Sequence, residues 1–219
     1  MACSPIESFL IEELPDANRW KRKVTSLDCV CYTEDFQLFD EKACCKCQDA
    51  SNTSCGEKAV AKFKVKDTVV LSYGLEDYLL AYGRYKKAQG SKCDFLHIDA
   101  QEKRFVLNEL TCSIEKYVDP FTNTKGSQEG KRAHAKKQMA NVIQLFAELP
   151  SLKDYMLSFL ERIALFSWRI PGEPINKAEE SMATFLQPQQ WVSNITLLES
   201  MPYDFKFIQQ IYPSTFVFD

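Results

Sequence analysis

The chain alternates apolar and polar positions in ways that predict strands before and after one long helix. Residues 59–66 place apolar side chains on one side and lysines on the other, which predicts a half-buried strand. Residues 68–73 are β-branched and apolar, so we expect a further strand there. A short helix over residues 75–87 should follow, because Leu and Tyr recur there at helical spacing.

The middle of the chain predicts a hairpin and then a helix. Residues 93–99 and 104–111 are two apolar runs separated by a tight polar turn, which is typical of antiparallel neighbours. After a polar loop, residues 130–149 carry apolar side chains at helical spacing up to Pro150. The crossover helix of an α/β fold would have this length and position.

The last third of the chain predicts a second helix and more strands. Ser151, with Asp154 three residues on, resembles a capping box that opens a helix ending near residue 160. Residues 163–170 and 205–218 predict strands, with a proline-rich loop between them. Strands, helix and strands in this order predict an α/β fold with a central mixed β-sheet flanked by helices.

Residues 1–57 form the least regular part of the pattern. Residues 24–32 predict a strand, and residues 40–57 are rich in Cys, Lys, Asp, Asn and Ser, as exposed loops are. The 219 residues are enough for one good domain. We therefore expect a single domain over residues 1–219, with an α/β core at 58–219 and an irregular, Cys-rich N-terminal decoration at 1–57.

Charge and composition narrow the classes of partner. The net charge is −3, so the molecule as a whole does not attract nucleic acid or anionic membrane, and a local basic patch would have to do so. The first residues lack the basic start and apolar stretch of a signal peptide, and no apolar run approaches about 18 residues. We expect a cytoplasmic protein without a membrane span.

The cysteines raise the hypothesis of a zinc site. Nine are present, and six fall within 27 positions, namely Cys29, Cys31, Cys44, Cys45, Cys47 and Cys55. Cys44 and Cys47 form a C-x-x-C knuckle, whose second pair would have to come from Cys29 and Cys31 or from Cys55. Reduced thiols without metal are the favoured alternative, because Cys-x-Cys is cramped for tetrahedral coordination and both histidines lie outside the cluster.

Two carboxylates on the predicted hairpin suggest a different metal. Asp94 and Glu109 are 109 − 94 = 15 positions apart on adjacent strands, so their side chains can converge at one edge of the sheet. Carboxylate and carbonyl oxygens are hard ligands suited to Mg²⁺ or Mn²⁺. A solvated hairpin face is the alternative. Both acids, however, adjoin apolar runs, and a charge within an otherwise buried strand needs a reason.

These residues resemble the PD-(D/E)XK nuclease superfamily, in which an aspartate on one strand precedes (Asp/Glu)-x-Lys on the next strand and a helix that often carries glutamine. The matching residues are Cys93-Asp94-Phe95-Leu96-His97-Ile98, Val106-Leu107-Asn108-Glu109-Leu110-Thr111 and Ala135-Lys136-Lys137-Gln138-Met139. The resemblance implies a restriction-endonuclease-like core over about residues 90–170. It also implies Asp94, Glu109 and the carbonyl of Leu110 as ligands of Mg²⁺ or Mn²⁺, with Gln138 facing the site.

The departure from the family pattern is Thr111, which stands where the motif has lysine. Some members of the superfamily recruit a basic residue from the following helix. At about 100° per residue, Lys131 and His134 share the flank of Gln138 and are the substitutes we expect. The alternative is that the basic residues of this helix only solvate it. His97 does not share the face of Asp94 and is better explained as a structural histidine than as a general base.

Three functional hypotheses remain open. The first is a metal-dependent nuclease acting on DNA, or less readily on RNA. The second is a catalytically inactive relative that binds nucleic acid or protein, which the net charge of −3 slightly favours. The third is a zinc-stabilised interaction module built on the cysteine loop. A protein partner or a homo-oligomer is compatible with all three.

Overall fold

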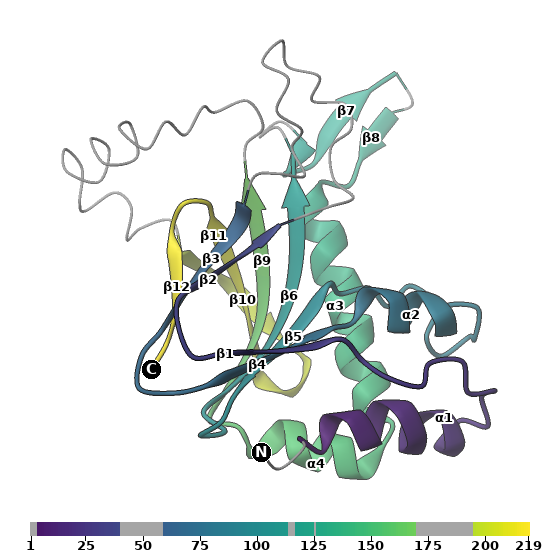
Figure 1. The fold of residues 1–219 in the computed structure, drawn as a ribbon. Coiled ribbons are helices and arrows are strands. Elements are labelled where there is room, and N and C mark those ends of the chain that lie inside the picture. Colours follow the sequence, from purple (N-terminus) through teal and green to yellow (C-terminus); the bar gives the residue numbers. More distant parts are fainter. Residues whose placement is uncertain (1–3, 40–58, 114–116, 125, 170–194) are drawn as a thin grey trace.

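A seven-stranded sheet forms the centre of the molecule (Figure 1). The structure, a computed structural model, describes residues 4–39, 59–113, 117–124, 126–169 and 195–219. In spatial order the strands are β1 (Cys29–Tyr32), β4 (Val70–Gly74), β5 (Phe95–Asp99), β6 (Arg104–Cys112), β9 (Glu161–Arg169), β11 (Phe205–Ile211) and β10 (Ile195–Met201).

The sheet is mixed in direction. Strands β1, β4, β5 and β6 pair antiparallel, whereas β6, β9 and β11 run parallel and β10 returns antiparallel to β11. Parallel neighbours need a long crossover, and helix α3 (Lys131–Ala147) supplies it between β6 and β9. The expected α/β fold with a central mixed sheet flanked by helices is confirmed. Strand β10 lies in a stretch for which the sequence pattern gave no strand.

Helices cover one face of the large sheet. Besides α3, they are η1 (Ser8–Glu13), α1 (Leu14–Ala17), α2 (Glu76–Tyr82) and α4 (Pro150–Ser158) (Figure 1). The apolar stripe of α3 is buried against the sheet, with Met139, Val142 and Phe146 fully enclosed. None of the described helices is long and apolar enough to cross a membrane.

A three-stranded sheet packs on the opposite face. Its order is β12 (Thr215–Phe218), β3 (Ala59–Val65) and β2 (Phe36–Phe39). The predicted strand at 59–66 therefore exists, but its apolar side chains, led by Phe63, meet the second face of the large sheet. The single strand expected at 205–218 is divided into β11 and β12. Pro213 separates them, because proline has no N–H to donate to a ladder.

The N-terminal segment is more regular than expected. Ile6, Leu10 and Leu14 are fully buried in the core on the helical face, and β1 extends the large sheet beyond β4. Two small elements complete the description, the hairpin β7 (Phe121–Asn123) and β8 (Gly126–Gln128), and the turn η4 (Pro202–Asp204). The expected Cys-rich loop, with Cys44, Cys45, Cys47 and Cys55, lies outside the described residues.

Candidate metal-binding site

The β5–β6 hairpin brings the two predicted carboxylates together. Phe95 lies opposite Asn108 in the antiparallel register, so Asp94, just before β5, lies opposite Glu109. Residues directly opposite one another on an antiparallel pair share a face, with Cβ atoms about 4.5–5.5 Å apart. Glu109 is only 5% exposed, so the pair lies in a largely desolvated corner of the sheet.

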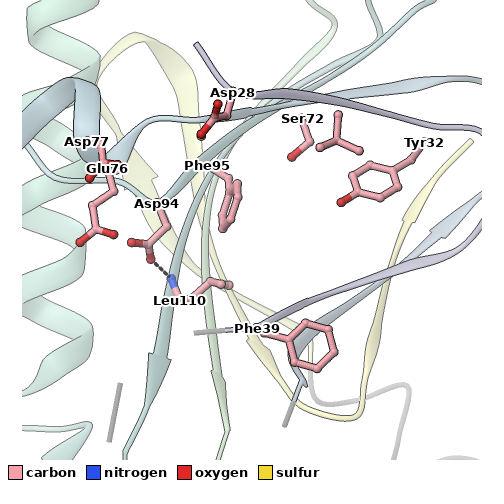
Figure 2. Close-up of a pocket in the computed structure, with 11 residues that line it drawn as sticks. Asp28, Tyr32, Phe39, Ser72, Glu76, Asp77, Asp94, Phe95 and Leu110 are labelled. Carbon is pink, nitrogen blue, oxygen red and sulfur yellow. Dashed lines mark hydrogen bonds between the residues drawn. The ribbon is translucent and has the colours of Figure 1, made fainter. Parts of the chain in front are cut away.

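The carboxylate of Asp94 occupies the place where β5 stops pairing with β6. Its Oδ2 accepts a hydrogen bond of 2.6 Å from the backbone N–H of Leu110 (Figure 2). In a strand, the N–H and C=O of one residue point to the same side, so the Leu110 carbonyl also faces this corner. The Asn108 carbonyl, two residues earlier, agrees with that direction, since it accepts from the Cys93 thiol at 3.3 Å. Two carboxylates and one carbonyl therefore face a common corner.

A lysine completes the site, and it comes from an unexpected position. Lys92, two residues before Asp94, places its Nζ 2.9 Å from Oε1 of Glu109. Burial lowers the pKa of Lys92, but the charge of Glu109, their hydrogen bond, and the charges of Asp94 and Glu76 outweigh burial, so the pKa is raised. Lys92 is therefore a permanent cation. Its side chain is still 42% exposed and can be reached from solvent.

The pKa of Asp94 is raised by its place in this corner. Burial and, after it, the negative charge of Glu109 raise its pKa to about 8, against opposing contributions from the Leu110 N–H and Lys92. Glu76, on α2, adds a further repulsion, and Figure 2 shows its carboxylate turned toward that of Asp94. A divalent cation in this corner would relieve that repulsion. The donor set, two carboxylates and a carbonyl, is of the hard-oxygen kind that Mg²⁺ and Mn²⁺ prefer.

The other predicted site residues lie on α3. Gln138 is half-buried, whereas Lys131 and His134 are exposed. His134 Nδ1 lies 3.9 Å from Glu129 Oε2, so the carboxylate beside His134 is that of Glu129. The basic group that adjoins Glu109 is Lys92, a residue outside the predicted set. The sequence signal that could have found it is the spacing Lys92-x-Asp94, which puts both residues just before the predicted strand's apolar run.

His97 is part of the core, as expected. It is fully buried on the face that meets the small sheet, with ring centroids 5.1 Å from Phe63 and 5.8 Å from Phe95. Burial lowers its pKa to about 3, so the ring is neutral at ordinary pH. His97 therefore takes no part in the chemistry around Asp94.

The zinc hypothesis rests mainly on residues that are not described. Cys29 and Cys31 lie on β1 as exposed free thiols. Among the described residues, no group of three or more His, Cys, Asp or Glu side chains is placed to hold a metal ion. That finding concerns sets of three such side chains, and the corner described above offers two carboxylates and a backbone carbonyl. Zinc binding by the cysteine loop stays a prediction.

Comparison of the chain with protein-family models, curated proteins and solved structures gave no match. Its function is therefore inferred from the chemistry of its own residues, above all Lys92, Asp94 and Glu109.

Proposed function

We propose that this protein is a metal-dependent phosphodiesterase that cleaves nucleic acid, DNA rather than RNA. The observation that carries the proposal is the meeting of Lys92, Asp94 and Glu109 at one end of the β5–β6 hairpin. The same order of parts, an aspartate at one strand, an acid within the next strand and then a helix, is the basis of the resemblance to PD-(D/E)XK nucleases. A restriction-endonuclease-like core is thus part of the proposal.

The metal in this proposal is Mg²⁺ or Mn²⁺, held by Asp94, Glu109 and the carbonyl of Leu110. Such an ion supplies stabilisation of charge on a phosphate and a lowered pKa for an attacking water. The chain contributes the geometry. The Leu110 N–H fixes one oxygen of Asp94 at 2.6 Å, and packing in the sheet holds Glu109 in place. Preformed ligands of this kind need little reorganisation when the ion enters.

Lys92 takes the role that the motif assigns to the lysine after the second acid. Its ammonium stands beside Glu109 and would counter the negative charge that develops on the phosphate in the transition state. Thr111 then no longer indicates lost activity, because Lys92, in the loop before β5, supplies the positive charge that the motif lysine would carry. Lys131 and His134 are not needed for this role, although as exposed groups on α3 they can meet a polyanion.

The catalytically inactive relative, binding nucleic acid or protein, remains the second candidate. The observation in its favour is that Glu109 already has an ionic partner at 2.9 Å. An acid neutralised by lysine can serve as a structural ion pair with no metal. The two candidates differ in whether a divalent ion binds and whether cleavage follows.

The deciding experiment is a cleavage assay on purified protein freed of metal and then supplied with Mg²⁺ or Mn²⁺. Single-stranded and duplex DNA and RNA are the substrates, with wild type, Glu109→Gln and Thr111→Lys compared. We expect metal-dependent cleavage of DNA that Glu109→Gln abolishes, because that swap removes a ligand charge with almost no change of shape. Thr111→Lys should change the rate only modestly, since Lys92 already supplies the charge.

Two results would contradict the nuclease. Cleavage that survives Glu109→Gln would indicate a contaminant or another site. No cleavage by wild type or by Thr111→Lys on any of these substrates would leave the inactive binding protein as the function.

A further inference from the structure

A pocket of about 320 Å³ adjoins the proposed metal site and shares Asp94 and Leu110 with it, and residues of both the large and the small sheet line it. Four carboxylates line it: Asp28 before β1, Glu76 and Asp77 at the start of α2, and Asp94 (Figure 2). Its described lining includes no lysine or arginine. Lys92, by contrast, pairs with Glu109. The pocket therefore has an acidic end, which favours a cation.

The opposite end of the pocket is aromatic. Tyr32 on β1, Phe39 on β2 and Phe95 on β5 line it, and they come from both sheets. Phe39 is 44% exposed and Val30, also in the lining, is 50% exposed, so apolar surface forms the rim. Aromatic faces beside carboxylates are the surroundings in which organic cations bind, through cation–π attraction and charged hydrogen bonds.

Ser72 is a second and independent sign of a ligand. It lies on β4 in the floor of the pocket and is only 4% exposed. Within the described part of the chain its hydroxyl makes no hydrogen bond, and Figure 2 shows it turned toward the space beside Phe95 and Tyr32. Buried hydroxyls are nearly always hydrogen-bonded. The Ser72 hydroxyl is not among the polar atoms sealed from solvent, so it opens into the pocket, where a ligand can replace water as its partner.

We propose that this pocket binds the side chain of an arginine presented by a peptide of a partner protein. A guanidinium is planar, so it can stack on Tyr32 or Phe39 while its N–H groups reach Asp28 and Ser72. Lysine, a compact and strongly hydrated ammonium, would use the aromatic wall less well. The volume is at the lower end of the range of about 300–1,000 Å³ for ligand sites, which suits one side chain and not a length of polymer. This binding goes beyond the proposed nuclease activity and does not depend on it.

The test uses N-acetyl-arginine amide as the probe and N-acetyl-citrulline amide as its neutral isostere. Binding to the full-length protein is followed by ¹H–¹⁵N NMR and titration calorimetry in metal-free buffer. We expect the arginine probe to shift the amides of Ser72 and Phe95 and to bind at least about tenfold more tightly than citrulline, since the isostere loses the charged hydrogen bonds. The matching lysine probe should bind more weakly than the arginine probe.

Variants locate the binding. Asp28→Asn and Phe39→Ala should each weaken the arginine probe by about three- to tenfold, through loss of a charged partner and of a cation–π face. Both residues are exposed in part, so neither change should unfold the protein. Asp154→Asn is the matched control and should leave the affinity unchanged, because it makes the same change at an exposed acid of α4 that does not line the pocket.

Five results would overturn the proposal. The first four are equal affinity for the arginine and citrulline probes, binding unaffected by Asp28→Asn, binding lost in Asp154→Asn, and pocket amides that respond to a mononucleotide such as GMP but not to the arginine probe. The fourth would assign the pocket to a nucleobase. A pocket that responds to Mg²⁺ alone would make its acids a metal site and would overturn the proposal equally.

Discussion

Replacing Asp94 by asparagine should make the protein more stable than wild type at pH 8 in metal-free buffer. Burial and the charge of Glu109 raise the pKa of Asp94 to about 8 from its ordinary value of 3.8. The asparagine side chain would keep an oxygen for the Leu110 N–H but would carry no charge. The variant therefore removes the cost of an ionised carboxylate while it keeps the hydrogen bond.

The sign follows from proton linkage. Between about pH 4 and pH 8 the unfolded chain has lost the Asp94 proton while the folded protein keeps it, so raising the pH favours unfolding. The free energy of unfolding of wild type should fall by up to about 1.4 kcal/mol per pH unit in this range. Over the whole range the upper bound is about 5–6 kcal/mol. Because Asp94 and Glu109 share one corner, we expect Asp94→Asn to gain about 2–4 kcal/mol at pH 8.

The measurement is urea unfolding followed by circular dichroism at pH 6.5 and pH 8, with EDTA present. This window avoids the buried His97, whose unfolded form takes up a proton only below about pH 6.5. The four groups that act on Asp94 are Glu109 on β6, Lys92 in the preceding loop, the Leu110 N–H and Glu76 on α2. The control is Asp77→Asn, an exposed acid of the same region, which should change the free energy of unfolding by no more than about 0.5 kcal/mol.

The reasoning would be refuted by an Asp94→Asn variant that is less stable than wild type at pH 8, or one that keeps the wild-type decline between pH 6.5 and pH 8. A second arm tests the metal. Mg²⁺ should stabilise wild type and leave Asp94→Asn nearly unchanged, because a ligand stabilises only the state that binds it.

Three further predictions follow from the same structure. Lys92→Gln should lower metal-dependent cleavage by about 10²–10³-fold, as loss of a transition-state donor does, whereas Lys131→Gln should cost less than tenfold; equal losses in steady-state assays would return the catalytic role to α3. Burial lowers the pKa of His97 to about 3, so below about pH 6.5 the unfolded chain binds a proton that the folded protein does not. His97 should therefore contribute a loss of up to about 2 kcal/mol of stability from pH 6.5 to pH 5, opposed by the gain that Asp94 contributes over the same range. Urea unfolding of His97→Leu should lack that loss, and an unchanged pH dependence would assign it elsewhere. Replacing Cys44, Cys45 and Cys47 by serine should leave the sheet folded, as measured by circular dichroism. Global unfolding of this variant would indicate a structural metal in the cysteine loop.

Local pattern was enough to predict the centre of the fold and the carboxylate pair. The hairpin of β5 and β6 has a short turn and two apolar runs, so its register, and with it the meeting of Asp94 and Glu109, follows from neighbours in sequence. The crossover helix α3 was also predictable, because its apolar stripe is long and regular.

The remaining features depend on contacts that no local pattern shows. The alternation of β3 is the same whichever sheet it joins, so its place in a second sheet could not be deduced. The N-terminal helix was missed, although Ile6, Leu10 and Leu14 recur every fourth residue, because Pro5 and Pro15 interrupt the usual signals. Lys92 was missed because it lies before β5, outside any periodic segment, so only its spacing from Asp94 could have indicated it.

The pairing of β12 with β3 has a consequence for how the protein is made. Phe216 lies opposite Phe63, 216 − 63 = 153 positions earlier, whereas the β5–β6 hairpin closes within a few residues. Long loops are slow to close, and a chain emerging from the ribosome cannot complete the small sheet until β12 is synthesised. The acidic corner at Asp94 can thus form early in synthesis. Strand β2 can likewise pair with β3 early, but Phe63 lacks its neighbours Phe216 and Phe218 until β12 is made. A chain stalled before residue 215 would therefore expose Phe63 to chaperones and proteases.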